Sequence, residues 1–367
     1  MKKLSLTSLS LTLFIISIFI LVLILAQNIL VPFALSIFFA YLFYPLVARI
    51  ERWGVQRGIS ILLVILIAIL LVGGAGLLVS AKLSNMTINF TELKEQFDTK
   101  AESLQHVLEN KIGVNPTTMD HYVSRVSESI FKSWESEVGS FFSATTTTIF
   151  QIGLLPVFIF FLLFYRTKTA YFIFKLVRRE NKPKTVHIMR EVSTVTTQYM
   201  GGMLIVVVIL AVLNSTGLLI IGVPNALAFG VLAAILNLIP YIGTFIGGLI
   251  PVIYILITSA HPFQTVIQIT ILFSIVQFLE NNLITPNIVG NNIKINPLAI
   301  ILSLLLANLV WGIAGMVIAV PCLAILKIIM RNIDQLEPFA YLISDRGTSK
   351  YEVSLKRIWK RIKKKHT

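Results

Sequence analysis

The chain has 367 residues, of which 56% are hydrophobic and only 13% are charged. This composition is too apolar for a soluble globular domain, so it excludes that class and indicates a protein that crosses the membrane several times. The net charge of +14 would suggest a nucleic-acid partner in a soluble protein, but here we interpret it as loop charge and expect no nucleic acid. With one cysteine, Cys322, no internal disulfide or cysteine metal cluster can form.

Five uncharged runs of about 18 to 21 residues are each long enough to cross about 30 Å of hydrocarbon as a helix. In chain order they are 9–26, 29–47, 59–79, 147–165 and 203–221. The first run follows two lysines and would also fit a secretory signal, but it is long and no small-residue cleavage pattern follows it. We therefore interpret all five as spanning helices.

The charges of the loops predict the orientation of these helices. The segment 166–191 has eight basic residues against two acidic ones, and the chain after residue 326 has eleven against four. The segment 80–146 instead has six basic and nine acidic residues. Because cytoplasmic loops carry an excess of Lys and Arg, we expect 80–146 outside as a small helical cap. Both termini, the loop 48–58 and the loop 166–191 are then cytoplasmic, with the basic segments on the anionic leaflet of the cell membrane.

Two later apolar segments, 226–258 and 298–329, have unusual lengths. Each has about 32 residues, or roughly 48 Å as a helix, which is too long for one crossing and too short for two. We expect each to enter the membrane and turn back as a broken hairpin, and long tilted helices are the alternative. The predicted fold is thus all-α and polytopic, with about 6 to 8 transmembrane helices.

The same two segments resemble each other. Asn237 precedes Pro251 by 14 positions and Asn308 precedes Pro321 by 13, with glycines between them in both cases. This pattern predicts an inverted internal repeat, although chance similarity of two glycine-rich runs is the alternative. Broken helices at matched positions indicate the binding site of a transporter. The predicted hinge residues are Pro240, Gly243, Gly247, Gly312, Gly315, Pro286 and Pro321, and close helix packing is the alternative role of the glycines.

These features divide the chain into five predicted parts. They are the N-terminal transmembrane helices (1–79), the extracytoplasmic insertion (80–146), a transmembrane helix with a basic loop (147–202), a transport core (203–331) and a basic cytoplasmic tail (332–367).

Glu280 is the only Asp, Glu, Lys or Arg between Glu191 and Lys294. A charged side chain within the bilayer costs at least about 3 kcal/mol, and such residues usually face a bundle interior or a water-filled path. Gln277 precedes Glu280 by three residues and so shares its helical face. The predicted site for solute or ion binding comprises Glu280, Gln277, Asn281, Asn237, Asn308 and Tyr241, without metal or cofactor. The alternative is that Glu280 only holds helices together.

Three motifs carry a family resemblance. They are the run Asn237–Gly243, the run Gln277–Asn282 with Pro286, and the run Gly312–Met316 with Pro321. With these motifs the chain resembles the autoinducer-2 exporter (AI-2E) family of bacterial permeases. The resemblance implies a multi-pass, homo-oligomeric exporter of small hydrophilic molecules or ions. Asn296 departs from the pattern, because a histidine is expected before Pro297.

Two functions are left open by these residues. No phosphate-binding glycine loop is present, Glu280 has no acidic companion in the hydrophobic half, and His261 is interpreted as an interfacial loop residue, so neither an ATP-driven pump nor an enzyme is expected. One function is a secondary transporter that exports a small hydrophilic solute similar to autoinducer-2. The other is an antiporter of sodium or another monovalent cation against protons. A carboxylate that exchanges a proton in a low-dielectric site serves both.

Overall fold

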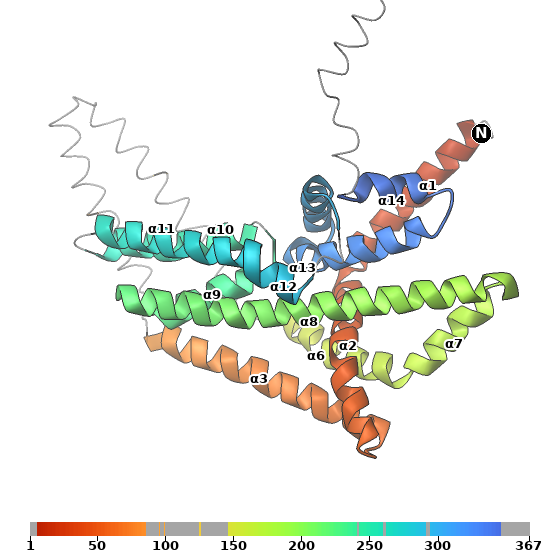
Figure 1. The fold of residues 1–367 in the computed structure, drawn as a ribbon, viewed down its shortest axis with the longest axis horizontal. Coiled ribbons are helices and arrows are strands. Elements are labelled where there is room, and N and C mark those ends of the chain that lie inside the picture. The colour runs from red at the N-terminus through yellow and green to blue at the C-terminus, as the bar shows by residue number, and fades with distance from the viewer. Residues whose placement is uncertain are drawn as a thin grey trace, which may run out of the picture. The chain divides into compact units, whose positions relative to one another are not determined.

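The computed structural model describes residues 6–85, 146–240, 242–259, 262–290 and 294–345, together with Glu95, Thr99 and Arg125 (Figure 1). In these parts of the chain the regular elements are helices, and the β contact is an isolated bridge between Ile295 and Ser344. The prediction of an all-α fold is therefore confirmed. Most of the predicted cap, and the tail from residue 346, lie outside the described residues.

The helices follow the apolar runs closely. They are α1 (Leu6–Leu25), α2 (Gln27–Arg52), α3 (Arg57–Asn85), α6 (Thr146–Phe164), α7 (Arg166–Leu176), the 3₁₀-helix η1 (Arg179–Asn181), α8 (Lys182–Ile221), α9 (Ala226–Leu236), α10 (Ile242–Thr258), α11 (Pro262–Leu279), the π-helix η2 (Glu280–Ile284), α12 (Thr285–Ile288), α13 (Pro297–Arg331) and α14 (Glu337–Ile343). Among the described residues, five helices are long and apolar enough to cross a membrane, or six with the bent pair formed by α6 and α7. The protein is therefore a polytopic membrane protein.

The chain forms two compact units, each described by itself. The first contains Met1–Thr169 and Met200–Val289, and the second contains Ala170–Tyr199 and Gly290–Thr367. The helix α8 is longer than the predicted run 203–221, because the basic stretch from Lys182 continues into the apolar run without a break. Its first part belongs to the second unit, and the part from Met200 belongs to the first.

In the first unit, α2, α3 and α6 share an apolar core. Its buried residues are Ala40, Val47, Ile61, Val64, Ile65, Ile159 and Leu163. At one end of this core, Arg166 donates to Glu51, and Arg57 donates to the carbonyl oxygen of Phe164 over 3.2 Å. The end of α2, the start of α3 and the end of α6 therefore meet. The basic loop 48–58 and the start of the basic segment 166–191 lie together, as a shared side of the membrane requires.

Labelling of introduced cysteines tests which side this is. With Cys322 replaced by serine, single cysteines at the exposed positions Trp53 and Lys168 are expected to react with a membrane-impermeant maleimide only after the cells are opened. A cysteine within 80–146 is expected to react in intact cells. Labelling of Trp53→Cys or Lys168→Cys from outside would reverse the predicted topology.

The segment 226–258 forms two helices that fold back on each other. The helix α9 has 11 residues, or about 16 Å, which is roughly half of the hydrocarbon thickness. It ends where Pro240 cannot donate a helical hydrogen bond. The helix α10 then runs antiparallel to α9, since the rings of Phe229 and Tyr254 lie 5.1 Å apart and a Cβ on Gly247 would lie 2.8 Å from the Cα of Ala233. The predicted interruption of this segment is present, and its re-entry into the membrane stays a prediction.

In the second unit, α13 is broken in the middle. Trp311 (φ −134°, ψ 17°) and Gly312 (φ 57°, ψ −141°) leave the helical conformation, and Gly312 takes a left-handed φ that favours glycine. A Cβ on Gly315 would lie 2.3 Å from the carbonyl oxygen of Ala307. Residues eight positions apart in a straight helix are about 12 Å apart along its axis, so the two halves fold back at this break. The segment 298–329 is therefore not one straight helix.

The same kind of close backbone contact occurs at each of the two breaks, within its own hairpin. A Cβ on Gly243 would lie 1.7 Å from the carbonyl oxygen of Leu236, the residue before Asn237. A Cβ on Gly315 would lie 2.3 Å from the carbonyl oxygen of Ala307, the residue before Asn308. In both hairpins a glycine thus packs on the carbonyl that precedes the asparagine. This common contact supports the internal repeat, whose inverted orientation stays a prediction.

Asn296, the position that departs from the family pattern, caps a helix in the second unit. Its Oδ1 accepts a hydrogen bond from the backbone N–H of Ala299 over 2.7 Å, and its Nδ2 donates to the carbonyl oxygen of Leu342 over 2.7 Å. Asparagine is among the best N-cap residues because its side chain satisfies a free N–H of the first turn. Asn296 therefore starts α13 and connects it to the end of α14.

Candidate functional site

Glu280 lies where the α-helix α11 changes into the π-helix η2. Pro286 lacks the N–H that would bond to the carbonyl of Asn282, and its ring would clash with that carbonyl in an α-helix. The chain widens instead, and the N–H of Thr285 bonds to the carbonyl oxygen of Glu280, five residues earlier. Single π turns inside α-helices occur frequently at functional sites. The predicted hinge Pro286 thus accounts for the local shape of the helix that carries the acid.

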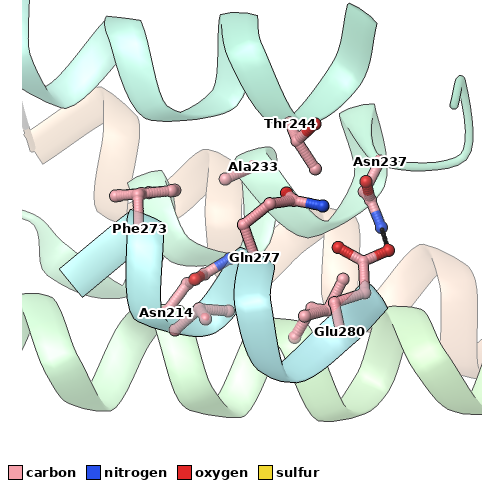
Figure 2. A pocket seen from close by; sticks show the side chains of 9 residues that line it. Asn214, Ala233, Asn237, Thr244, Phe273, Gln277 and Glu280 are labelled. Atoms are coloured by element: carbon pink, nitrogen blue, oxygen red, sulfur yellow. Dashed lines mark hydrogen bonds between the residues drawn. The ribbon is translucent and has the colours of Figure 1, made fainter. Parts of the chain in front are cut away.

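The carboxylate of Glu280 is held by the first hairpin. Only 8% of Glu280 is exposed, and the Nδ2 of Asn237 donates to its Oε1 over 2.6 Å (Figure 2). Asn237 is itself buried and sits directly after α9, at the start of the break. A hydrogen bond to a buried carboxylate is stronger than one between neutral groups. The acid at the start of η2 is therefore coupled to the point at which the hairpin turns.

Around this pair lies a narrow pocket within the first unit. Its walls come from α8, the α9–α10 hairpin and α11, and the lining residues are Leu210, Asn214, Ala233, Asn237, Thr244, Phe273, Val276, Gln277 and Glu280 (Figure 2). The free volume inside is about that of one water molecule. The pocket combines several polar groups with apolar walls, but in this conformation it is too small for a solute.

The other predicted binding residues lie in different places. Gln277 lines the pocket, and its Nε2 donates over 3.1 Å to the Oδ1 of Asn281, which is exposed. Tyr241 lies outside the described residues. Asn308 is exposed on α13 in the second unit, so its approach to Glu280 stays a prediction.

Two of the amides next to Glu280 differ in their partners. The sequence favours Gln277, Asn281 or Asn308 as donors to the acid and turns Asn281 and Asn282 away from its face toward the hairpins. In the structure Gln277 makes a side-chain hydrogen bond to Glu280, as predicted, and Asn237 donates to it over 2.6 Å. The Nδ2 of Asn282 instead donates to the carbonyl oxygen of Phe278 over 2.8 Å.

The predicted hinge residues fall into two groups. Pro240 and Gly312 lie at the breaks of the two hairpins, and Pro286 lies just after the π-helix. The others pack inside the hairpins, with Gly243 and Gly247 against α9, Gly315 against the first half of α13 and Pro321 buried in its second half.

Asn214 on α8 is a pocket residue that the sequence patterns did not predict. It lines the pocket, only 4% of it is exposed, and its Oδ1 has no hydrogen-bond partner among the described residues. An unpaired buried amide oxygen costs about 1–3 kcal/mol. The available signal was an asparagine in the otherwise apolar run 203–221.

The polar groups of the pocket can exchange a proton and form hydrogen bonds. Across the described parts of the chain, no group of three His, Cys, Asp or Glu side chains is placed to hold a metal ion. Glu280 is the pocket's ionisable group, and amides supply its other polar atoms. Such a site can release and take up a proton while its amides bind a polar solute.

Comparison with known proteins gives the family. The Bacillus subtilis (strain 168) protein YrrI, a candidate transport protein by name, is 29% identical over 311 residues, which cover 83% of this chain and 86% of YrrI. The Escherichia coli (strain K12) AI-2 transport protein TqsA is 24% identical over 330 residues, which cover 87% of this chain and 90% of TqsA. The profile of the AI-2E family transporters matches residues 13–335. The resemblance seen in the sequence motifs is thereby confirmed, and the chain belongs to the AI-2E family of membrane transporters.

Proposed function

We propose that the protein is a secondary transporter that exports a small hydrophilic solute similar to autoinducer-2 and that it works as a homo-oligomer. The observation that carries the proposal is the hydrogen bond between Asn237 and Glu280, because it joins the one acid of the apolar half to the turn of a broken helix. The name of TqsA, an AI-2 transport protein, supports the class of solute.

The exchange of a proton at Glu280 would change this bond. An ionised carboxylate accepts strongly from the Nδ2 of Asn237, whereas a protonated one gives a weaker, neutral bond. Protonation therefore loosens the turn of the first hairpin from η2. Because the closed pocket has no room for a solute, the hairpin has to move for a solute to enter. Proton uptake and solute access are coupled through the same contact.

Flux through proteoliposomes tests this proposal. Vesicles containing the purified protein are loaded with labelled autoinducer-2, and its efflux is measured with and without an imposed pH gradient. We expect the gradient to accelerate efflux compared with protein-free vesicles. Sodium-driven proton movement without solute efflux would instead establish the cation/proton antiporter. If neither flux depends on the protein, both functions are excluded.

A further inference from the structure

The second hairpin begins and ends at the same place. Residues 295–326 include no Asp, Glu, Lys or Arg, and Lys294 and Lys327 stand at the two ends of this stretch. Although the two lysines are 33 residues apart, the Nζ of Lys327 donates to the carbonyl oxygen of Lys294 over 2.6 Å. The two legs of α13, which part at Gly312, therefore meet again at their charged ends.

A strap closes this base, formed by α14 and the two residues after it (337–345). The helix α14 turns back alongside the end of α13 (Figure 1). The backbone N–H of Asn296 donates to the carbonyl oxygen of Ile343 over 2.9 Å, and that of Asp345 donates to the carbonyl oxygen of Lys294 over 3.0 Å. The side chain of Asn296 adds a third bond to the strap, over 2.7 Å. Because the strap follows the end of α13 and binds the residues at its start, it joins the two legs.

The first part of α8 holds the same base. The Nη2 of Arg331, the last residue of α13, donates to both carboxylate oxygens of Glu191 over 2.6 and 2.7 Å. Hydrogen bonds between ionised groups are stronger than those between neutral groups. The base of the second hairpin is therefore fastened by the lysine bond, by the strap and by α8, all within the second unit.

We propose that only the first hairpin moves during transport and that the second stays closed as a fixed support. The inference rests on the proposed function and adds which part of the protein moves. In the first hairpin the turn is bound to Glu280, and protonation of this acid weakens the bond. The bonds at the base of the second hairpin do not involve Glu280, so its protonation leaves them unchanged. Opening that base would break several hydrogen bonds together.

A disulfide across the base tests whether it stays closed. Ile295 and Ser344 form an antiparallel β-bridge, and opposite residues of such a pair have Cβ atoms about 4.5–5.5 Å apart, close to the span of a disulfide. With Cys322 replaced by serine, Ile295→Cys/Ser344→Cys is oxidised and its flux is measured in proteoliposomes. We expect the oxidised protein to transport at the rate of its own reduced form. Flux that is lost on oxidation and restored by a thiol reductant would overturn the inference, and so would failure of the disulfide to form.

A second disulfide serves as the matched comparison in the first hairpin. A Cβ on Gly248 of α10 would lie 3.7 Å from the Cβ of Phe273 on α11, and disulfides join Cβ atoms about 3.8 Å apart. Oxidation of Gly248→Cys/Phe273→Cys, again without Cys322, ties this hairpin to α11. It is expected to stop the flux seen with the reduced form. Equal flux in the oxidised and reduced forms would mean that the first hairpin does not move, which contradicts the inference.

Hydrogen exchange tests the closed base without any transport assay. The backbone N–H groups of Asn296 and Asp345 are bonded across the base, so slow exchange is expected at both in the purified protein. Asn296→Ala removes both side-chain bonds of this residue and should accelerate exchange at Asp345 about tenfold. Rapid exchange at both amides in the wild type would overturn the inference. If exchange is slow but no flux is found, the closed base stands and the proposed function fails.

Discussion

Replacement of Glu280 by glutamine is expected to abolish pH-dependent transport and leave the folded protein intact. The glutamine Oε1 can accept the same hydrogen bond from the Nδ2 of Asn237, so the turn of the hairpin keeps its partner. The bond loses its ionic component, which costs about 1 kcal/mol. What disappears is the exchange of a proton. In proteoliposomes, efflux driven by a pH gradient should fall to the rate of protein-free vesicles, while the melting temperature stays close to the wild-type value.

A matched control for this experiment lies on the same helix. Ser274 is exposed on α11, and its Oγ donates to the carbonyl oxygen of Thr270 over 2.7 Å. Ser274→Ala removes a polar group of the helix without touching the pocket, so wild-type flux and pH profile are expected. If Glu280→Gln also transports with an unchanged pH profile, Glu280 only joins helices, which is the alternative that its sequence position left open.

The apolar helices could be predicted because a long run of hydrophobic residues determines each of them. The runs 9–26, 29–47, 59–79 and 147–165 lie within, or within one residue of, α1, α2, α3 and α6. The run 203–221 covers only the apolar part of α8, which begins at Lys182. Hydropathy measures transfer into lipid, so it does not show that a helix extends beyond the apolar run into basic residues. The interruptions at 237–240 and at Gly312 were also predictable, since proline and glycine interrupt a helix for local reasons.

The acid and its neighbour on the same helix could be predicted, but its donor from the hairpin could not. Glu280 stands out in the sequence as the single charge of a long apolar half. Helical spacing favours Gln277 as its neighbour, and Gln277 does make a side-chain hydrogen bond to it, but a further donor, at 2.6 Å, is Asn237, which is 43 residues away in the chain. Spacing describes one helix, whereas this bond depends on how the α9–α10 hairpin packs against α11. The π-helix adds a second difficulty, because after Glu280 the side chains no longer follow the α-helical period.

Asn214 shows a further limit of the sequence. An asparagine in a transmembrane run can face lipid, join two helices or line a cavity. Because the residue type is the same in each case, the sequence does not distinguish these roles. Its burial, its unpaired oxygen and its place in the pocket wall become visible only when α8, α10 and α11 are packed. Sites built from several helices therefore leave only part of their lining recognisable in a sequence.

Replacement of Gly243 by alanine is expected to open the first hairpin and to inactivate the protein. A Cβ at this position would lie 1.7 Å from the carbonyl oxygen of Leu236 and 2.7 Å from the backbone nitrogen of Asn237. Both neighbours are backbone atoms, so no side-chain rotation can relieve the clash, and the turn itself has to move. Overpacking of a tight site costs about 1–3 kcal/mol and sometimes more. Movement of Asn237 would also break its 2.6 Å bond to Glu280, so transport should be lost together with stability.

Two further glycines make this test decisive. Gly201 lies in the helix α8, and a Cβ there would have its nearest neighbour, a side-chain carbon of Leu42, at 4.0 Å. Gly201→Ala should therefore fold normally and gain about 0.5–1 kcal/mol, because alanine suits a helix better than glycine. Gly315→Ala should behave like Gly243→Ala, since its Cβ would meet the carbonyl oxygen of Ala307 at 2.3 Å. Melting temperatures of the three purified variants give the comparison. If Gly243→Ala melts like Gly201→Ala, the tight turn at Asn237 does not hold the site; if only Gly315→Ala is tolerated, the two hairpins are not equivalent.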